Sequence, residues 1–390
     1  MAQTIDQAKT GGFENVAVIG FGLIGASFAA ALRAANPSAQ VMAVDTDLAT
    51  RVEAVNRGWA TATAAPDAAE FRAFIEDGCD LVVLATPVSV VEGYLKDLAE
   101  WGYRGIITDT ASTKSRIIEM AAHTLPYPQN FVPGHPMAGS EKNGIVGARA
   151  DLFKGAYWIL CPDADTPAEH FTRLHELITG IGARVISLPR EQHDAAVAVV
   201  SHVPHFTASS LVQLAVHHAK GQDSLMRLAA GGFKDSTRIA AGSPELWCGI
   251  AFDNKDALLG GLREMQDIIG QFADALEAGD RAMLTSLLAE AADARRALPA
   301  AWLPCTERLL EVRIPMEDRP GVVAEVTTIT SKVGCNIQSI EIDHVTEDSA
   351  VLSLVLTDEG DIGKLSAHLI NAGFSVSFSP LAPKEHTHVG

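Results

Sequence analysis

The segment VPGHPMAGSEKNG, residues 132–144, places the ionisable ring of His135 between a glycine and a proline. A histidine ring can accept the proton of a hydroxyl group while a hydride leaves the carbon that bears this hydroxyl. Gly134 would let the chain turn at the end of a strand, and Pro136 restricts the backbone of His135, so the ring direction is fixed before a substrate arrives. We therefore expect His135 to act as a general base; taken alone, a surface or capping role is the alternative.

Ser112 is a second polar group that could take part in the same chemistry. It lies in DTASTKS, directly after the strand-like GIIT, while the next strand-like run, NFVPGHP, leads to His135. Because the carboxyl ends of parallel strands meet at one edge of a sheet, we expect the hydroxyl and the ring to converge in one crevice. Ser112 also precedes the helix-like TKSRIIEMA, so a simple N-cap is the alternative interpretation.

A glycine-rich loop opens the chain's first regular pattern. Gly20, Gly22 and Gly25 have G-x-G-x-x-G spacing between the strand-like NVAVI and an Ala-rich helix. In such loops the first glycine permits a tight turn, the second lets the backbone approach a pyrophosphate, and the third lets the helix pack closely. The phosphate then meets the unpaired N–H groups of the helix start, here at Leu23 and Ile24. The spacing predicts a dinucleotide site.

The next two strand ends extend this predicted site. Asp45 lies twenty residues beyond Gly25. A carboxylate there binds the adenosine ribose and repels a 2′-phosphate, which favours NAD over NADP. Thr86 and Pro87, at the end of LVVLATP, lie where the sheet edge would meet the nicotinamide half. The alternative is a packing loop, with Asp45 as a helix cap and an ordinary turn at Thr86.

The run EQHDAAVAVVSHVPHF supplies a group of ionisable side chains, His193, Asp194, His202 and His205. Their spacing, interrupted by Pro204, lacks the i, i+4 ligand pair of a helical zinc site, so we expect no metal. His202 and His205 either line a pocket for an anion or are hydrogen-bonded groups of the core. The sequence alone does not decide between these two roles.

A cationic residue suited to an acidic substrate follows in GGFKDSTRIAAGSPELW, which carries Arg238 and Trp247. A guanidinium group binds a carboxylate through two parallel hydrogen bonds. With 48 acidic and 30 basic residues, the chain needs such a local cation if its substrate is an acid. An ion pair with a neighbour such as Asp235 is the alternative role for Arg238.

Composition limits the class of protein. The 390 residues favour two or three domains at roughly 150 residues each. Hydrophobic residues make up 47%, and no uninterrupted apolar run approaches the roughly 20 residues of a membrane helix. The polar N-terminal MAQTIDQAKTGG and five scattered cysteines favour the cytoplasm. A net charge of -18 disfavours binding to nucleic acid.

The chain has three regions. Residues 13–188 alternate β-branched apolar runs with amphipathic helices, which predicts an α/β, Rossmann-type domain whose parallel sheet is covered on both faces. Residues 189–300 have helical patterns and no convincing strand, and their surplus apolar surface suggests an oligomer interface. Residues 308–383 give the order βαββαβ of a ferredoxin-like unit.

Five motifs in register make residues 15–300 resemble the prephenate dehydrogenase family. They are VAVIGFGLIGASF, DTASTK, GHPMAGSEKNG, HDAAVAVVSHVPH and STRIAAGSPELW. The resemblance implies an oxidative decarboxylation in tyrosine biosynthesis. NAD takes a hydride from the ring carbon that bears the hydroxyl group, carbon dioxide leaves, and aromatisation makes the step irreversible, which yields 4-hydroxyphenylpyruvate.

The same resemblance implies a role for each matching residue. His135 would accept the hydrogen bond and the proton of the substrate ring hydroxyl, and Ser112 would hold both groups in register near the nicotinamide. Arg238 would bind a substrate carboxylate. The residues that would line or close the pocket are His202, His205, Glu141 and Trp247. The resemblance also implies a homodimer, in which either subunit could supply Trp247 to a given active site.

The C-terminal region, with IPMEDRPGVVAEV and GCNIQSIEI, resembles an ACT domain. Domains of that family bind a small amino acid, so the resemblance implies L-tyrosine as a feedback effector. Exposed N–H groups at a helix start beyond Pro320 can hold a carboxylate. The matching effector residues are Asp318, Gly321, Asn336 and Ile337. A unit that only dimerises is the alternative.

Three other functions stay open. Arogenate dehydrogenase differs in the substrate side chain, an amino acid instead of a keto acid, although the ACT resemblance and Asp45 favour prephenate and NAD. A hydroxy-acid dehydrogenase would share the domain layout but would not explain the motifs around His135 and Arg238 together. A sensor without catalytic activity would bind nucleotide and tyrosine but would not require Ser112, His135 and Arg238.

Overall fold

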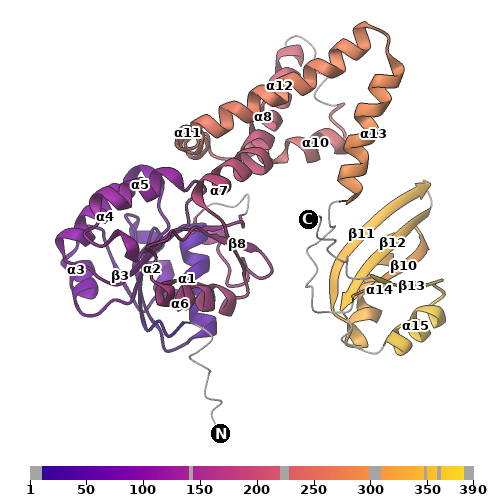
Figure 1. The fold of residues 1–390 in the computed structure, drawn as a ribbon. Coiled ribbons are helices and arrows are strands. Elements are labelled where there is room, and N and C mark those ends of the chain that lie inside the picture. Colours follow the sequence, from indigo (N-terminus) through magenta and orange to yellow (C-terminus); the bar gives the residue numbers. More distant parts are fainter. Residues whose placement is uncertain are drawn as a thin grey trace. The chain divides into compact units, whose positions relative to one another are not determined.

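The structure is a computed structural model that describes residues 11–139, 144–219, 228–297, 309–346, 349–357 and 362–381. The chain divides into two compact units, Met1–Gly270 and Gln271–Gly390, which are both traced in Figure 1. The boundary between them falls within the helix α12 (Lys255–Glu277).

A six-stranded sheet forms the centre of the first unit, in the order β3-β2-β1-β4-β5-β6 (Figure 1). All five of its pairings are parallel, so the expected parallel sheet is confirmed. The strand order reverses between β1 and β4, and in such sheets ligands bind at the carboxyl ends of the strands at this point. The strands are β1 (Asn15–Ile19), β2 (Gln40–Val44), β3 (Ala62–Ala64), β4 (Leu81–Leu84), β5 (Ile106–Asp109) and β6 (Phe131–Val132).

Helices cover both faces of this sheet because alternate residues of each strand point to opposite sides. Val16 and Val18 of β1 pack in one core with α1 and α6, whereas Ala17 and Ile19 pack in the other with α3, α4 and α5. The helices of this part are α1 (Leu23–Ala35), α2 (Leu48–Asn56), α3 (Ala69–Glu76), α4 (Val88–Glu100), α5 (Ser115–Thr124) and α6 (Ala168–Gly180).

His135 does not lie on the parallel sheet. The expectation that one parallel sheet takes all the strands of residues 13–188 is wrong, because only Phe131 and Val132 of NFVPGHP join it, as β6. Pro133 has no N–H to continue the ladder after β6, and β7 (Gly134–Pro136) pairs instead with β8 (Tyr157–Leu160), antiparallel. With β9 (Arg184–Ser187) parallel to β8, these strands make a separate three-stranded sheet.

Gly134 is required by close packing rather than by a turn. Its φ is not among the positive values that favour glycine. A Cβ at this position would lie 2.8 Å from the carbonyl oxygen of Asp109 and 2.9 Å from Nε1 of Trp158. Any side chain would therefore push β7 away from β5 and β8.

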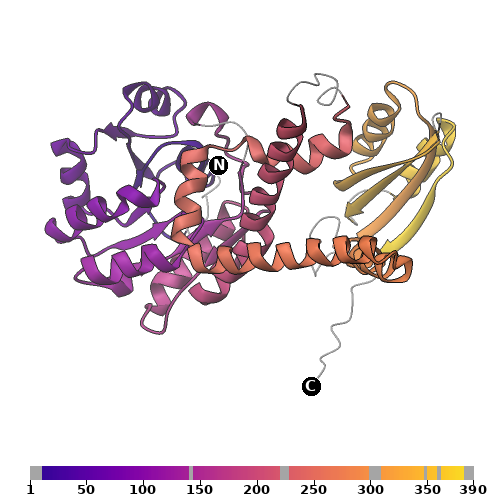
Figure 2. The ribbon, with the colours of Figure 1, turned by 90° about the horizontal axis from the view of Figure 1, so that it is seen from above.

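The rest of the first unit is helical, as expected, and contains no strand among the described residues from 190 to 270. One continuous helix, Arg190–Ala219, is long and apolar enough to cross a membrane by length and composition, with a mean hydropathy of 1.3 in its most apolar window. Figure 2 shows α12 as the long orange helix. The elements are α7 (Arg190–Val197), a π-helical segment η4 (Ala198–His202), α8 (Val203–Ala219), α10 (Gly231–Thr237), a 3₁₀ turn η5 (Arg238–Ala241), α11 (Pro244–Asp253) and α12.

The second unit contains α13 (Arg281–Ala297) and a small antiparallel sheet in the order β11-β12-β10-β13. Two helices pack on one face of the sheet, around a core that includes Val312, Leu354 and Leu365. The elements follow the expected order βαββαβ: β10 (Leu309–Glu317), α14 (Val322–Lys332), β11 (Ile337–Thr346), β12 (Ser349–Thr357), α15 (Ile362–Asn371) and β13 (Ser377–Leu381).

Candidate active site

The glycine loop between β1 and α1 has the geometry that a dinucleotide requires. Gly20 has φ +88°, and a Cβ on it would lie 2.6 Å from the carbonyl oxygen of Ala85. A Cβ on Gly25 would lie 2.0 Å from the carbonyl oxygen of Gly20, so only glycine allows the helix to start this close to the strand. The space beside Gly22 is open, and this N-cap residue makes no side-chain hydrogen bond to the start of α1.

Asp45 stands at the end of β2 and points back to the glycine loop. Its Oδ2 accepts a 2.7 Å hydrogen bond from the N–H of Phe21, and its Oδ1 accepts one from the N–H of Asp47. The cap of α2 is Asp47, whose carboxylate accepts from Ala49 and Thr50. The alternative role of Asp45 as a helix cap is therefore wrong, and its position fits ribose binding.

Thr86 and Pro87 follow β4, next to the loop. The Oγ1 of Thr86 is buried and has no hydrogen-bond partner in the described part of the chain. A buried hydroxyl without a partner costs about 1–3 kcal/mol, and a ligand would relieve that cost. Its Cγ2 lies 2.8 Å from the position of a Cβ on Gly20. Pro87 is the exposed N-cap residue of α4. These features fit a bound dinucleotide.

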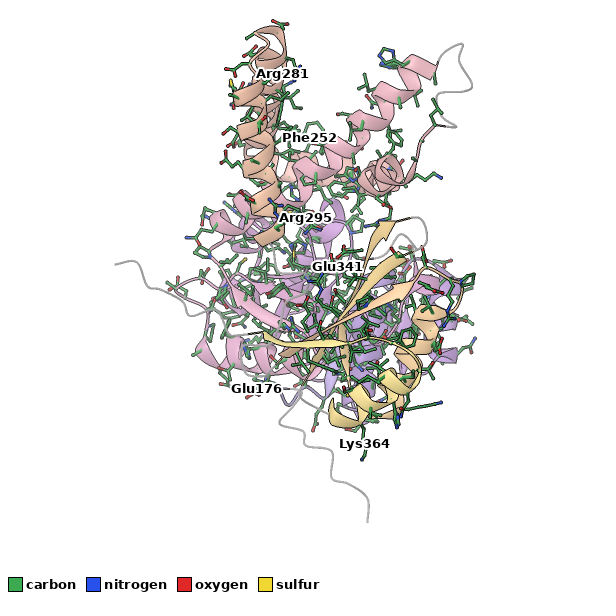
Figure 3. The ribbon with its side chains drawn as sticks, turned by 90° about the vertical axis from the view of Figure 1, so that its right-hand side faces the viewer. Glu176, Phe252, Arg281, Arg295, Glu341 and Lys364 are labelled. Carbon is green, nitrogen blue, oxygen red and sulfur yellow. The ribbon has the colours of Figure 1, made fainter. Side chains whose placement is uncertain are left out.

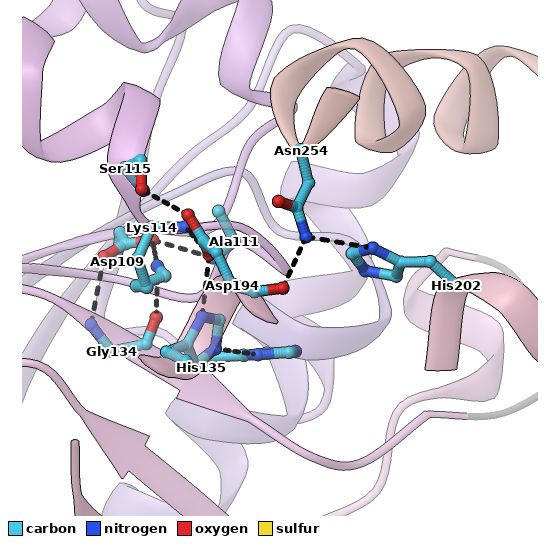
Figure 4. A network of polar contacts seen from close by, with 10 residues as sticks. Asp109, Ala111, Lys114, Ser115, Gly134, His135, Asp194, His202 and Asn254 are labelled. Atoms are coloured by element: carbon cyan, nitrogen blue, oxygen red, sulfur yellow. Dashed lines mark hydrogen bonds and ion pairs between the residues drawn. The ribbon is translucent and has the colours of Figure 1, made fainter. Parts of the chain in front are cut away.

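His135 is buried, with 7% of its surface exposed, and begins a chain of hydrogen bonds (Figure 4). Its Nδ1 lies 2.8 Å from Nε2 of His193. The other nitrogen of that second ring, Nδ1, lies 2.8 Å from Oδ1 of Asp194. Two histidines and a carboxylate from segments far apart in the sequence thus form one line.

The carboxylate of Asp194 also caps α5. It accepts 2.8 Å hydrogen bonds from the backbone N–H groups of Lys114 and Ser115. The helix begins at Ser115, so the alternative role of Ser112 as its N-cap is wrong. Ser112 lies half-buried in the loop after β5, and its hydroxyl makes no hydrogen bond to the described residues.

A buried ion pair holds the start of β7. The side chains of Lys114 and Asp109 are both 0% exposed and contact each other. The ammonium group also donates a 2.7 Å hydrogen bond to the carbonyl oxygen of Gly134. The carboxylate accepts from the N–H groups of Gly134 and Ala111, at 3.0 and 2.9 Å. These added hydrogen bonds offset the desolvation of the two charges and fix the backbone next to His135.

His202 and His205 lie together with Trp247. The ring of His205 stacks on Trp247 with a centroid separation of 3.5 Å and an interplanar angle of 11°. His202 meets the same indole edge-on at 6.1 Å. Asn254 connects this group to the first, because its Nδ2 donates to the carbonyl oxygen of Asp194 at 2.8 Å and lies 3.3 Å from Nδ1 of His202.

Arg238 begins the 3₁₀ turn η5, which packs against α8, the helix that carries His205. Its side chain is exposed and makes no ion pair with any described residue, including Asp235, the partner of the alternative interpretation. Glu141 lies outside the described residues. Among the residues that the structure does describe, no group of three His, Cys, Asp or Glu side chains is arranged to hold a metal ion.

The burial of the histidines keeps their rings neutral. Burial, helped by the charge of Lys114, holds the pKa of His135 well below its usual value. Burial also lowers the pKa of His202 to about 4 and lowers the pKa of His205. All three rings are therefore acceptors or neutral donors near neutral pH.

Asp194 is the negative end of this group. Burial alone would raise its pKa, but hydrogen bonds from His193, Ser115 and Lys114 outweigh that effect and lower the pKa to about 2. The carboxylate is therefore ionised near neutral pH. It is the fixed charge that orients the two rings next to it.

The sequence did not assign a role to several of these residues. His193 and Asp194 were visible as an adjacent His-Asp pair, and Lys114 as the end of DTASTK. Their contacts join segments 58 to 80 residues apart, which no local pattern shows. Asn254 had no sequence signal.

This fold and site define a nucleotide-dependent dehydrogenase, with a dinucleotide loop and a buried histidine whose pKa is lowered. Two family models match the chain: "Prephenate dehydrogenase, nucleotide-binding domain" over residues 28–187, and "Prephenate dehydrogenase, dimerization domain" over residues 189–290. The prephenate dehydrogenase of Bacillus subtilis is 32% identical over 352 residues, which cover 89% of this chain and 93% of that protein. The chain belongs to the prephenate dehydrogenase family.

Solved structures support the same assignment. The prephenate dehydrogenase of Aquifex aeolicus in complex with hydroxyphenyl propionate and NAD+ aligns with a TM-score of 0.69 and 27% identity, over 73% of this chain and 98% of that one. The arogenate dehydrogenase of Synechocystis aligns with a TM-score of 0.61 and 28% identity, over 72% and 98%. The chain is an NAD-dependent dehydrogenase, as expected.

Proposed function

We propose that this protein catalyses the NAD-dependent oxidative decarboxylation of prephenate to 4-hydroxyphenylpyruvate, a step of tyrosine biosynthesis in the cytoplasm. The observation that carries the proposal is the neutral, buried ring of His135, which is hydrogen-bonded through Nδ1 and leaves Nε2 for a substrate. His135 belongs to the same compact unit as the dinucleotide loop around Gly20.

The residues of the chain would act on the substrate as follows. Bound NAD supplies the hydride acceptor. His135 Nε2 accepts the proton of the ring hydroxyl as the hydride leaves the ring carbon that bears this hydroxyl. The ring carboxylate then departs as carbon dioxide, and the electrons of its C–C bond complete the aromatic ring. The proton returns to the phenol oxygen. General base catalysis of this kind contributes about 10² to 10⁴ in rate.

The other predicted site residues bind and enclose the substrate in this proposal. Prephenate is a dianion, and Arg238 has an exposed guanidinium without an ion pair among the described residues. It would hold a carboxylate, with His205, His202 and Trp247 beside it. Two further residues complete the set: Ser112 would orient His135 and the hydroxyl, and Glu141, which lies outside the described residues, would close the pocket.

One assay tests the reaction and separates prephenate from arogenate. Purified protein is mixed with NAD and either compound, and NADH formation is followed. We expect a higher kcat/KM with prephenate, in line with the Bacillus subtilis relative. Faster turnover of arogenate would reassign the substrate, in line with the Synechocystis structure, and no NADH from either compound would overturn the proposal.

Feedback by L-tyrosine through the C-terminal unit is the second part of the proposal. Gly321 has φ +87° and is the N-cap of α14, so the cap residue itself makes no side-chain hydrogen bond to the start of the helix. A carboxylate of an amino acid fits such an end. Asp318, Asn336 and Ile337 would complete this ACT-like site. Adding tyrosine to the same assay should lower the rate, and calorimetry should show that tyrosine binds; a rate that does not respond would remove the effector.

A further inference from the structure

The line His135–His193–Asp194 determines which nitrogen of each ring carries a proton. Asp194 is ionised and can only accept hydrogen bonds, so Nδ1 of His193 must donate to it. A neutral ring has one N–H, and Nε2 of His193 is then an acceptor. His135 must therefore donate from Nδ1 across the 2.8 Å contact, which leaves its Nε2 without a proton.

The opposite arrangement would block the base. If His193 carried protons on both nitrogens, its Nε2 would donate to His135, and His135 would keep its own proton on Nε2. That ring could then donate to the substrate but not accept from it. The two arrangements therefore differ in whether Nε2 of His135 carries a proton, and the NMR experiment described below measures that proton directly.

We propose that His193 and Asp194 are positioning residues that hold His135 in the tautomer with Nδ1 protonated and Nε2 free to accept. This inference rests on the proposed role of His135 as the base. No proton reaches Asp194 during turnover. When His135 has taken the substrate proton, its Nδ1–H still donates to His193, and the nearby carboxylate stabilises the positive ring.

The surrounding contacts make Asp194 a rigid end for this line. Its two oxygens accept from the first turn of α5, and its backbone carbonyl accepts from Asn254. The carboxylate therefore keeps its direction in the absence of substrate. A ring oriented in advance loses less entropy when the substrate binds.

The tautomer can be measured without any substrate. Protein labelled with ¹⁵N in its 13 histidines is examined by long-range ¹H–¹⁵N NMR, and His135 is assigned by comparison with His135→Asn. We expect Nδ1 of His135 to carry the proton and Nε2 to have the chemical shift of an unprotonated nitrogen. A proton on Nε2 of His135 in the wild-type protein would overturn the inference.

Two variants test the consequence for catalysis. Asp194→Asn places an amide N–H opposite groups that now donate to the carboxylate, among them Nδ1 of His193. The variant therefore favours the His193 tautomer that carries its proton on Nε2. His193→Asn removes the ring but leaves in place the two hydrogen bonds that Asp194 accepts from Lys114 and Ser115 at the start of α5. In both variants kcat with prephenate should fall on the order of 100-fold, while KM changes little. Asp280→Asn is the matched control, because Asp280 caps α13 through the N–H of Met283 and contacts no described histidine.

The outcomes separate a positioning role from a purely structural one. If Asp194 only capped α5, Asp194→Asn would lower the thermal midpoint, but His193→Asn would keep its kcat, and the inference would fail. The NMR result is independent of the substrate. A wild-type protein that does not oxidise prephenate would refute the proposed function while the tautomer of His135 remained as measured.

Discussion

The ring of His135 can accept a proton only while it is neutral, so its pKa decides the conditions under which the site works. Burial and the charge of Lys114 hold that pKa well below its usual value. The same Lys114 fixes the backbone of Gly134, one residue earlier. One buried cation thus contributes to both the position and the protonation of His135.

Replacing His135, the proposed base, should affect chemistry and leave cofactor binding unchanged. We expect His135→Asn to lower kcat at least on the order of 100-fold, because the amide cannot take a full proton. The affinity for NAD should stay near that of the wild-type protein, since the glycine loop and Asp45 make no described contact with this ring. Stopped-flow kinetics and NAD titration measure the two quantities. Equal loss of NAD affinity would show that the ring belongs to a different site.

The neutral histidines also make the fold sensitive to acid. The pKa of His202 is lowered from 6.5 to about 4, so between these two pH values the unfolded chain binds a proton that the folded chain does not. The free energy of unfolding should therefore rise with pH across this window and be lost as the pH falls through it. Urea unfolding at a series of pH values measures the slope. His202→Asn should reduce the slope, and an unchanged slope would mean that His202 is protonated in the folded state.

Single residues show what the sequence could predict. The glycine spacing predicted the turn at Gly20, which has a positive φ, and the close packing at Gly25, where a Cβ would meet the carbonyl oxygen of Gly20. The buried state of Lys114 was not predictable, since lysine is usually exposed and its partner Asp109 follows from the three-dimensional path of the chain. The role of Ser112 beside His135 stays a prediction.

At the scale of elements, the contact between β1, the loop and α1 limits the dinucleotide site. A Cβ on Gly25 would meet the carbonyl oxygen of Gly20 at 2.0 Å. Such overpacking costs about 1–3 kcal/mol and moves the helix start that would face the phosphates. The loop and the helix must therefore shift together if this residue changes.

Gly25→Ala tests this element directly. We expect weaker NAD binding by calorimetry and a lower thermal midpoint. Gly93→Ala is the matched control, because a Cβ on Gly93 of α4 meets nothing within 4 Å. Alanine there should keep the NAD affinity and stabilise the helix by about 0.5–1 kcal/mol. A Gly25→Ala protein with normal NAD affinity would contradict the geometry of the loop.

Two elements departed from sequence-based expectation for physical reasons. Pro133 separates β6 from β7, and β8 and β9 pair with β7 in the second sheet. An apolar run predicts a strand but does not show which strand it pairs with. The π-helical segment Ala198–His202 inserts a wider turn between α7 and α8. Helical periodicity assumes a constant turn, so it could not place His202 relative to His193.

At the scale of the whole molecule, the helical part leaves large apolar side chains in water. Phe252 of α11, labelled in Figure 3, is 69% exposed, and Leu214 of α8 is 57% exposed. The matching family model is described as a dimerization domain. We propose that these helices form the interface of a homodimer, because apolar patches of this kind mark association surfaces.

A charge within that surface should separate the subunits. We expect light scattering to report a dimer for the wild-type protein and a monomer for Leu214→Asp, since a carboxylate cannot be buried there without a partner. Val55→Asp makes the same change at a 47% exposed side chain of α2 and should stay dimeric. A wild-type monomer would contradict the proposed assembly.

The architecture of the first unit was predictable in its outline. The change from alternating to purely helical patterns predicted the parallel sheet and the helical part that follows it. The division into 13–188, 189–300 and 308–383 stays a prediction beside the two compact units, because sequence patterns do not show how tightly neighbouring parts pack. The ACT assignment of the last region likewise stays a proposal.

The contacts of α5 have a consequence for how the first unit melts. Asp194 holds the start of this helix, and Arg116 on the same helix pairs with Asp253 at 2.5 Å. Both partners come from the helical part, so neither part can lose its structure without breaking polar contacts of the other. Residues 11–270 should unfold as one cooperative block, with equal calorimetric and van't Hoff enthalpies for that heat-absorption peak. Two separate peaks from this unit would show that heat separates His135 from the His193–Asp194 pair that it contacts.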